Sequence, residues 1–273
     1  SGISATGNIL LSAAETGEGT TADITLNASV ISTTGNITLL AQGGIVQTAD
    51  VGDITVSAAG KSIDLKAAAG ISMGDGALTQ SNNGNVRYEA TAGTITLGEI
   101  STGTAGTTTG QVAIIATAGS IVDLGTDTSA VDITAAGLIL SAGVGIGAGA
   151  NHLETSVSTL TASAGAGGVY VSEANGVTVS NLTVAVNRVG TDASVPVTAG
   201  GSATVTQEDL IVSGAGNLVL VSVLGDVVVN AGVTAGAVSL QTGNSLIQAT
   251  AGALTFNAAL AASGAAIRAS RQE

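Results

Sequence analysis

The sequence predicts an all-β protein: a right-handed parallel β-helix (solenoid) of about ten coils of roughly 25 residues, with three short strands in each coil. Three observations lead to this prediction. A glycine-led run of alternating apolar residues recurs along the chain, and aliphatic residues and glycine dominate a composition that is almost free of aromatic rings. In addition, no apolar stripe with the period of a helix extends over three turns.

The first element is a run of the form Gly, small or polar, apolar, any, apolar, which we call the first column. Its spacing is about 25 residues, and its first six copies align best because a small Ala follows each apolar pair. The runs begin at Gly7, Gly35, Gly60, Gly84, Gly110, Gly137, Gly168, Gly201, Gly225 and Gly252. In the first six, the apolar pairs are Ile9/Leu11, Ile37/Leu39, Ile63/Leu65, Val86/Tyr88, Val112/Ile114 and Leu138/Leu140.

Two further columns follow the first within each repeat. The second column begins about nine residues after each start, with a glycine before its apolar residue, at 43–46, 69–72, 92–95, 118–121 and 144–147. The third column is looser and includes 53–56, 77–80, 131–134 and 158–161. Each run alternates apolar and polar residues, which is typical of a strand with one buried face.

Strands this short are stable only when they stack. Three strands per coil, paired in parallel with the coils above and below, would place every apolar position inside the solenoid. Glycines would form the corners, where the backbone needs a positive φ or the absence of a side chain. The right-handed winding follows from the general rule for parallel crossovers. The narrow interior would leave no room for aromatic rings, which suits a chain with two Tyr, one Phe and no Trp.

Charge and composition exclude several classes of partner. Six Lys and Arg against 19 Asp and Glu give a formal net charge of −13, so we expect neither nucleic-acid binding nor attraction to an anionic membrane. Cysteine is absent, which rules out disulfides and thiolate metal sites. The longest apolar run, 217–229, is interrupted by Gly225 and Asp226. We therefore predict no membrane insertion.

We expect residues 1–273 to form a single parallel β-helix segment. Both ends match the middle of a repeat and show no capping helix, so the segment is expected to be a piece of a longer rod. The repeats are longer within 137–200. Inserted loops there, including 187–196, are expected to project from one face and to bind partners.

The runs "GNITLLAQGGIVQTADVGDITVSAAG" (35–60) and "GDVVVNAGVTAGAVSLQTGNSL" (225–246) resemble the shaft repeats of large bacterial exoproteins of the filamentous-haemagglutinin type. The resemblance covers about residues 7–264. It implies a parallel β-helix adhesin or toxin-delivery rod that is secreted or displayed on the bacterial cell surface. The family's N-terminal secretion module carries an Asn-Pro-Asn signature, and the single proline here, Pro196, lies in "ASVPVT". The resemblance therefore implies shaft rather than secretion module.

Candidate chemistry is sparse, and we predict no catalytic, cofactor-binding or metal-binding residues. Asp53 and Asp64 lie at outward positions of their strands, but neither has clustered basic residues nearby in sequence. The four arginines are scattered and interpreted as solvated surface charges: Arg87, Arg188, Arg268 and Arg271. His152, the single histidine, forms His-x-Glu with Glu154, which alone is a poor metal site.

Three minor patterns have a structural and a functional interpretation. "GDGA" (74–77) and "GTDTS" (125–129) suggest calcium turns, although no nonapeptide calcium repeat recurs, so polar turns are the simpler interpretation. Asn-x-Ser/Thr at Asn27, Asn36 and Asn181 marks either turn asparagines or glycosylation acceptors.

The sequence thus favours a non-catalytic shaft segment that acts as a stiff spacer in cell adhesion or cell–cell contact. Its expected partners are neighbouring coils of the same parent protein and a host or partner cell surface. The alternatives are a polysaccharide-degrading β-helix enzyme and a glycan-binding module that uses the loops of the long coils. Against an enzyme, the sequence shows no aromatic platform for sugars and no clustered acid and base.

Overall fold

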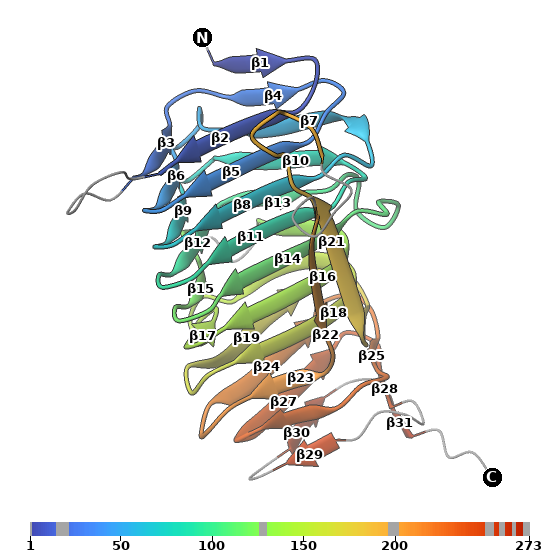
Figure 1. The fold of residues 1–273 in the computed structure, drawn as a ribbon. Helices are drawn as coiled ribbons and strands as arrows, with labels where there is room; N and C mark the ends of the chain where they lie inside the picture. Colours follow the sequence, from blue (N-terminus) through green and yellow to red (C-terminus); the bar gives the residue numbers. More distant parts are fainter. Residues whose placement is uncertain are drawn as a thin grey trace.

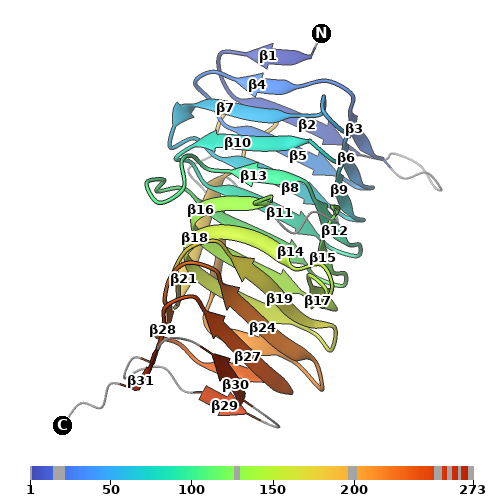
Figure 2. The ribbon, with the colours of Figure 1, turned by 180° about the vertical axis from the view of Figure 1, so that it is seen from behind.

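The chain folds as an all-β parallel solenoid of about nine turns of roughly 25 residues. The computed structural model describes residues 2–14, 22–125, 130–195 and 202–248, with side chains as far as Leu246, and the backbone of three short strands beyond them. Coils stack from the N-terminal end to the C-terminal end of the rod (Figure 1; from behind in Figure 2). The described residues include no helix of the length and apolarity that crossing a membrane requires.

The first column is confirmed for the first six repeats. Ile9 pairs with Ile37, Ile37 with Ile63 and so on through Leu138, in the register that the apolar pairs predict. The strands are β2 (Ile9–Ala13), β5 (Ile37–Ala41), β8 (Ile63–Ala67), β11 (Val86–Ala90), β14 (Gln111–Ala116) and the second parts of β16 (Ile133–Ala142) and β18 (Leu153–Ala164).

The second and third columns also form parallel ladders. The second contains β3 (Ile24–Leu26), β6 (Ile45–Gln47), β9 (Ile71–Met73), β12 (Ile95–Leu97), β15 (Ile121–Asp123), β17 (Gly145–Ile146), β19 (Gly168–Glu173), β24 (Asn217–Ser222), β27 (Ala237–Thr242) and β30 (Leu260–Ser263). The third contains β1 (Ile3–Ala5), β4 (Val30–Ser32), β7 (Ile54–Ala59), β10 (Leu78–Asn82), β13 (Glu99–Ser101) and the first parts of β16 and β18.

Three assignments made from the sequence pattern are wrong. The run at Gly168 belongs to the second column, because Val169 pairs with Ile146. Residues 158–161 belong to the first column, because Leu160 pairs with Leu138. The run that begins at Gly201 is not a coil start, because its described residues, from Ser202 on, lie in strand β22 (Ser202–Gln207), which pairs antiparallel with β21 (Leu182–Asn187). Ten predicted coils thereby become about nine.

The β21–β22 hairpin is inserted into the middle of one first-column strand. β20 (Val177–Val179) pairs with one part of β18, and β23 (Leu210–Val212) pairs with the next part of the same strand. The ladder therefore continues past the insertion without losing a layer. Below it lie β25 (Val227–Val229), β26 (Val233–Ala235), β28 (Ser245–Gln248), β29 (Leu254–Phe256) and β31 (Ala266–Ala269).

The β21–β22 strand pair does not project from the rod. It lies along the outside of the first column, across the strands of several coils (Figure 1), and β21 contacts β8, β11, β14, β16 and β18. At its far end Asn8 Nδ2, in the first coil, donates to the carbonyl of Ala193 at 2.9 Å. The long-coil segment thus braces the solenoid instead of extending from it.

The interior is a stack of aliphatic residues. In the second column a single inner ladder of eight residues runs through seven pairings, and every member is at most 2% exposed. Each residue packs on its counterpart one layer away, so burial is continuous along the rod. The ladder consists of Ile45, Ile71, Ile95, Ile121, Ile146, Val169, Leu218, with Val238, 2% exposed, at its end.

The same side-chain-to-backbone hydrogen bond recurs at several corners of the solenoid. An Asn or Asp before a strand accepts the backbone N–H of the next coil: Asn36 Oδ1 accepts from Ser62 N, and Asp53 Oδ1 accepts from Leu78 N. Glycines occupy corners where coils touch. A Cβ on Gly84 would lie 1.8 Å from the carbonyl oxygen of Lys61, so no other residue fits there.

The interior also holds a tyrosine at one of the predicted apolar positions, so the expectation that the interior has no room for aromatic rings is wrong. Tyr88 is fully buried at an inner position of β11. Its hydroxyl lies 2.5 Å from Gln47 Oε1 and 2.6 Å from Thr79 Oγ1, both inside the solenoid. Gln47 Nε2 in turn donates to the carbonyl of Gly52. One strand from each column thus contributes to a polar network that satisfies the hydrogen bonds of the tyrosine hydroxyl within an aliphatic core.

We expect Tyr88→Phe to lower the free energy of unfolding by about 1–3 kcal/mol, because Gln47 and Thr79 would each lose a buried partner. Tyr170→Phe removes the same hydroxyl at a partly exposed position and is expected to cost less than about 0.5 kcal/mol. Urea unfolding followed by circular dichroism measures both variants. Equal losses in the two variants would contradict a stabilising role for the network.

Candidate functional site

The hairpin buries a cluster of charges that the sequence pattern places on the surface. Asp64 is fully buried, and its two carboxylate oxygens accept from Arg87 Nε at 2.9 Å and Arg188 Nε at 2.8 Å. Arg87 is only 4% exposed. The prediction that these arginines are scattered, solvated charges is therefore wrong. They converge because β8 and β11 are adjacent in the ladder and the hairpin carries Arg188 back onto them.

The hairpin matches the outward ladder beneath it. The apolar residues of that ladder, Ala113 and Ile139, pack against Leu182 and Val184 of β21. Farther along, where the ladder is polar, Thr38 Oγ1 accepts from the backbone N–H of Val189 at 2.9 Å and is fully buried. Apolar and polar residues of the insertion thus lie over residues of the same kind, which fixes its position on the rod.

Two further charges extend the cluster to the edge of the hairpin. Lys66 Nζ lies 2.8 Å from Glu89 Oε1, and Arg87 Nη1 also pairs with Glu89. Burial alone would raise the pKa of Glu89, but the hydrogen bond from Lys66 and the charges of Arg87 and Lys66 together lower it below its ordinary value. Glu89 is therefore held as a carboxylate at neutral pH. Arg87 Nη2 is buried without a hydrogen-bond partner.

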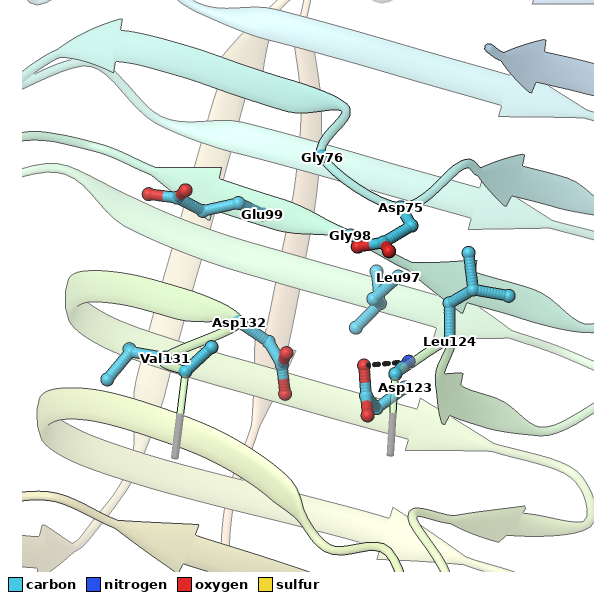
Figure 3. A pocket seen from close by; sticks show the side chains of 11 residues that line it. Asp75, Gly76, Leu97, Gly98, Glu99, Asp123, Leu124, Val131 and Asp132 are labelled. Carbon is cyan, nitrogen blue, oxygen red and sulfur yellow. Dashed lines mark hydrogen bonds between the residues drawn. The ribbon is translucent and has the colours of Figure 1, made fainter. Parts of the chain in front are cut away.

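A second cluster is acidic and lies on a different part of the rod. Asp123, Asp132 and Glu154 each place one carboxylate oxygen within 4.8 Å of the others. The side chains of Asp123 and Asp132 lie across a small hollow from each other, with Asp75 two coils away toward the N-terminal end (Figure 3). The hollow has a volume of about 170 Å³, and Glu99 also lines it. None of the described residues that line it is basic or aromatic.

The local structure explains how these acids meet. Asp132 Oδ2 accepts the backbone N–H of Glu154 at 2.8 Å, which is the corner hydrogen bond found elsewhere in the rod. Asp123 Oδ1 accepts the N–H of Gly125 at 3.0 Å, and its Oδ2 accepts Asn151 Nδ2 at 3.0 Å. Asp123 and Asp132 each make hydrogen bonds within the corner, and stacking of the next coil brings a carboxylate oxygen of Glu154 close to theirs.

This convergence changes the protonation of Asp132. Burial, and then the nearby charges of Asp123 and Glu154, raise its pKa to about 8, against the opposing hydrogen bond from the backbone of Glu154. Asp132 therefore carries a proton at neutral pH beside other carboxyl groups. Such an arrangement can hold or donate a proton, and carboxylate oxygens this close could also hold a hard cation such as Ca²⁺.

A further acid is buried in the coil below. Glu173 is fully buried, and its carboxylate accepts from Thr155 Oγ1 and from the backbone N–H groups of Val157 and Asn175. Burial outweighs these bonds and raises its pKa to about 7. These bonds join residues of two adjacent coils at a corner.

The structure places the residues considered from sequence in different environments. His152 lies outside the acidic cluster: its ring centroid is 6.1 Å from that of Tyr170, and burial lowers its pKa. Asp53 serves a corner, as described above. Asn36 is 4% exposed and hydrogen-bonded in the corner ladder, which confirms its interpretation as a turn residue. Asn27 and Asn181 are exposed. Arg268 and Arg271 have no described side chains.

The sequence analysis does not predict the acidic cluster, although some of the residues around it belong to motifs that it names. "GDGA" supplies Asp75 and Gly76 to the hollow, and Gly125 opens "GTDTS", whose residues 126–129 lie outside the described residues. Glu154 was noted only beside His152. Asp123 and Asp132 lie in one coil and match no functional motif, and their approach to Glu154 depends on how that coil stacks on the next one.

In comparisons with known proteins, no family model, no curated protein and no solved structure matches this chain.

The protonated Asp132 makes stability depend on pH. Its folded pKa of about 8 exceeds the ordinary value of 3.8, so its contribution is present in full below about pH 4 and is lost as the pH rises to about 8. Asp132→Asn keeps an oxygen for the N–H of Glu154 and removes this loss. We expect the variant to exceed the wild type in free energy of unfolding by about 2 kcal/mol at pH 8.5 and to match it near pH 4.

Urea unfolding between pH 4 and pH 8.5 measures this difference. Asp75→Asn, which removes an exposed acid from the same hollow, is the matched control and should leave the pH profile of the wild type unchanged. A constant difference between Asp132→Asn and wild type across this range would contradict the raised pKa.

Proposed function

We propose that the chain is a non-catalytic shaft segment of a large secreted or cell-surface bacterial protein, in which it acts as a stiff spacer for cell adhesion or cell–cell contact. The observation that supports this most is the uninterrupted inner ladder from Ile45 to Val238. Each layer is held to the next by backbone hydrogen bonds and by apolar contact. Bending or slipping at one layer would break both, so the rod resists deformation.

The hairpin adds to this stiffness. It is anchored to the first coil through Asn8, to the third layer through Asp64, and to the coil of β18 through Gln207, whose Nε2 donates to Thr161 Oγ1 at 3.2 Å. An element fixed at several heights along one face opposes bending toward or away from that face. A brace of this kind suits a spacer that transmits force.

The resemblance to filamentous-haemagglutinin-type shafts supports the proposed extracellular or outer-surface location. In that setting the partners of the segment are neighbouring coils of the same parent protein, and a host or partner cell surface is contacted at the end of the rod. The acidic net charge of −13 would keep such a rod soluble and apart from nucleic acid and anionic lipid.

Stiffness can be measured because the chain has no cysteine. Spin labels on Val46→Cys and Ser239→Cys, next to the two ends of the inner ladder, are seven layers apart, or about 34 Å at about 4.8 Å per layer. We expect one narrow distribution of distances in pulsed electron spin resonance. The same pair in 8 M urea provides the flexible control, and a native distribution as broad as this control would contradict the spacer.

The acidic hollow supports a second candidate function, a polysaccharide-degrading enzyme. Asp132 holds a proton at neutral pH beside Asp123, and a carboxyl pair of this kind can supply a general acid and a carboxylate. The small volume and the lack of aromatic lining among the described residues oppose it.

Reducing-end assays on a panel of plant and bacterial polysaccharides distinguish the two functions. A spacer gives no turnover on any of them. Turnover that falls at least about 100-fold in Asp132→Asn but not in Asp75→Asn would replace the spacer with the enzyme.

A further inference from the structure

Basic residues gather at one place on this acidic rod. The structure describes the side chains of four of the six Lys and Arg, and three of these, Lys66, Arg87 and Arg188, lie together beside the hairpin. Among the described residues, their salt bridges are with Asp64 and Glu89, so three positive charges meet two negative ones and this group of five side chains has a net charge of +1. A positive excess in a chain of net charge −13 needs a physical reason.

A cavity of about 390 Å³ opens beside this cluster, and Lys66 and Arg188 both line it. Its other walls come from the edges of β2, β5 and β8 and from the corners that follow them. Hydroxyl groups are supplied by Ser12 and Thr91, and Leu40 contributes an apolar surface. The volume lies in the range of pockets that hold small organic ligands.

The two cations retain capacity to bind. The Lys66 side chain is 42% exposed and its ammonium carries three N–H groups, of which Glu89 takes one. Arg188 is 24% exposed, and its ion pair with Asp64 uses Nε. Arg87 lies behind them, with Nη2 buried and without a partner, and adds positive charge that water does not screen.

We infer that this cavity binds a small sugar acid, with the carboxylate of the ligand between Lys66 and Arg188. The hydroxyl groups of Ser12 and Thr91 would bond to sugar hydroxyls, and Leu40 would contact the apolar side of the ring. A carboxylate fits the charge better than a phosphate does, because a net charge of +1 balances a monoanion and Asp64 and Glu89 would repel a second negative charge. Long polyanions of high charge density are disfavoured by the remaining acids of the rod.

The inference does not rest on the spacer role. A stiff rod functions with or without a ligand on its side, and the distance measurement above tests stiffness alone. The source of the sugar acid is either a free monosaccharide or a uronate unit within a polysaccharide, since both present the same carboxylate and hydroxyl groups.

Isothermal titration calorimetry of the full chain tests the inference. The probes are sodium glucuronate and sodium galacturonate as free acids, trigalacturonate as a polysaccharide fragment, and glucose as the neutral control. We expect saturable binding of at least one acid and none of glucose. Tighter binding of trigalacturonate than of either monomer would indicate the polysaccharide source, and the reverse order would indicate the free acid.

Matched variants locate the site. Lys66→Gln should weaken binding by about tenfold or more, because it removes a charged hydrogen-bond donor. Lys61→Gln removes the same charge from a neighbouring corner that does not line the cavity, and should change the affinity less than about twofold. Equal weakening in the two variants would show general attraction to positive charge and overturn the site, as would the absence of saturable binding of every acid.

Arg188→Gln is a second test, read together with its thermal midpoint because Arg188 also anchors the hairpin. Loss of binding in a variant whose circular dichroism spectrum is native supports the site. If that variant unfolds, Lys66→Gln and Lys61→Gln still decide the question, because Lys66 is partly exposed and its loss leaves the hairpin anchored.

Discussion

The spacing between layers is the constraint on which the rest of the structure depends. Parallel pairing places successive coils about 4.8 Å apart, so each residue lies directly over its counterpart in the next coil. Inside, this favours Ile, Leu and Val, which pack on themselves in any number of layers. At the corners it brings backbones so close that Gly84 and Lys61 leave no space for a Cβ. It also gives an Asn or Asp at one height a backbone N–H to accept from at the next.

The same spacing explains where polar groups are allowed inside. A buried polar side chain needs partners within its own layer or the adjacent one, because those are the only groups in reach. Tyr88, Gln47 and Thr79 meet this condition by coming from the three different columns and bonding to one another. The same requirement applies where the hairpin covers the outward face of the first column. Side chains that would be exposed on a bare solenoid are buried there, so Asp64 and Arg87 must be paired.

Much of the fold was predictable because alternation and coil length are written in the sequence. Ile37 and Leu39, with their counterparts in five other repeats, identify the inner positions of the first column without any tertiary information. The same pattern could not separate one column from another, as Gly168 and Gly201 show, since a glycine-led alternating run describes a strand in any ladder and in a hairpin. Nor does alternation reveal what covers the outward face. Asp64 reads as exposed until Arg188, 124 residues away, is known to return to it.

Proximity within the candidate sites follows from stacking, which is why the sequence did not predict it. Asp132 makes the same corner bond as Asp53, and its pKa is raised because the side chain is buried and Asp123 and Glu154 lie beside it. Several corner acids, among them Asp209 and Asp226, likewise use an oxygen to hold a backbone N–H of the next coil. The large negative charge of the chain is therefore in part a consequence of how its corners are built. The local electrostatic potential then depends on the charged groups that are not used up in corner bonds. On this rod such groups lie at two places, the acidic hollow and the basic cavity. A solenoid of uniform layers would have neither, so the sites arise where coil length varies and where the insertion folds back.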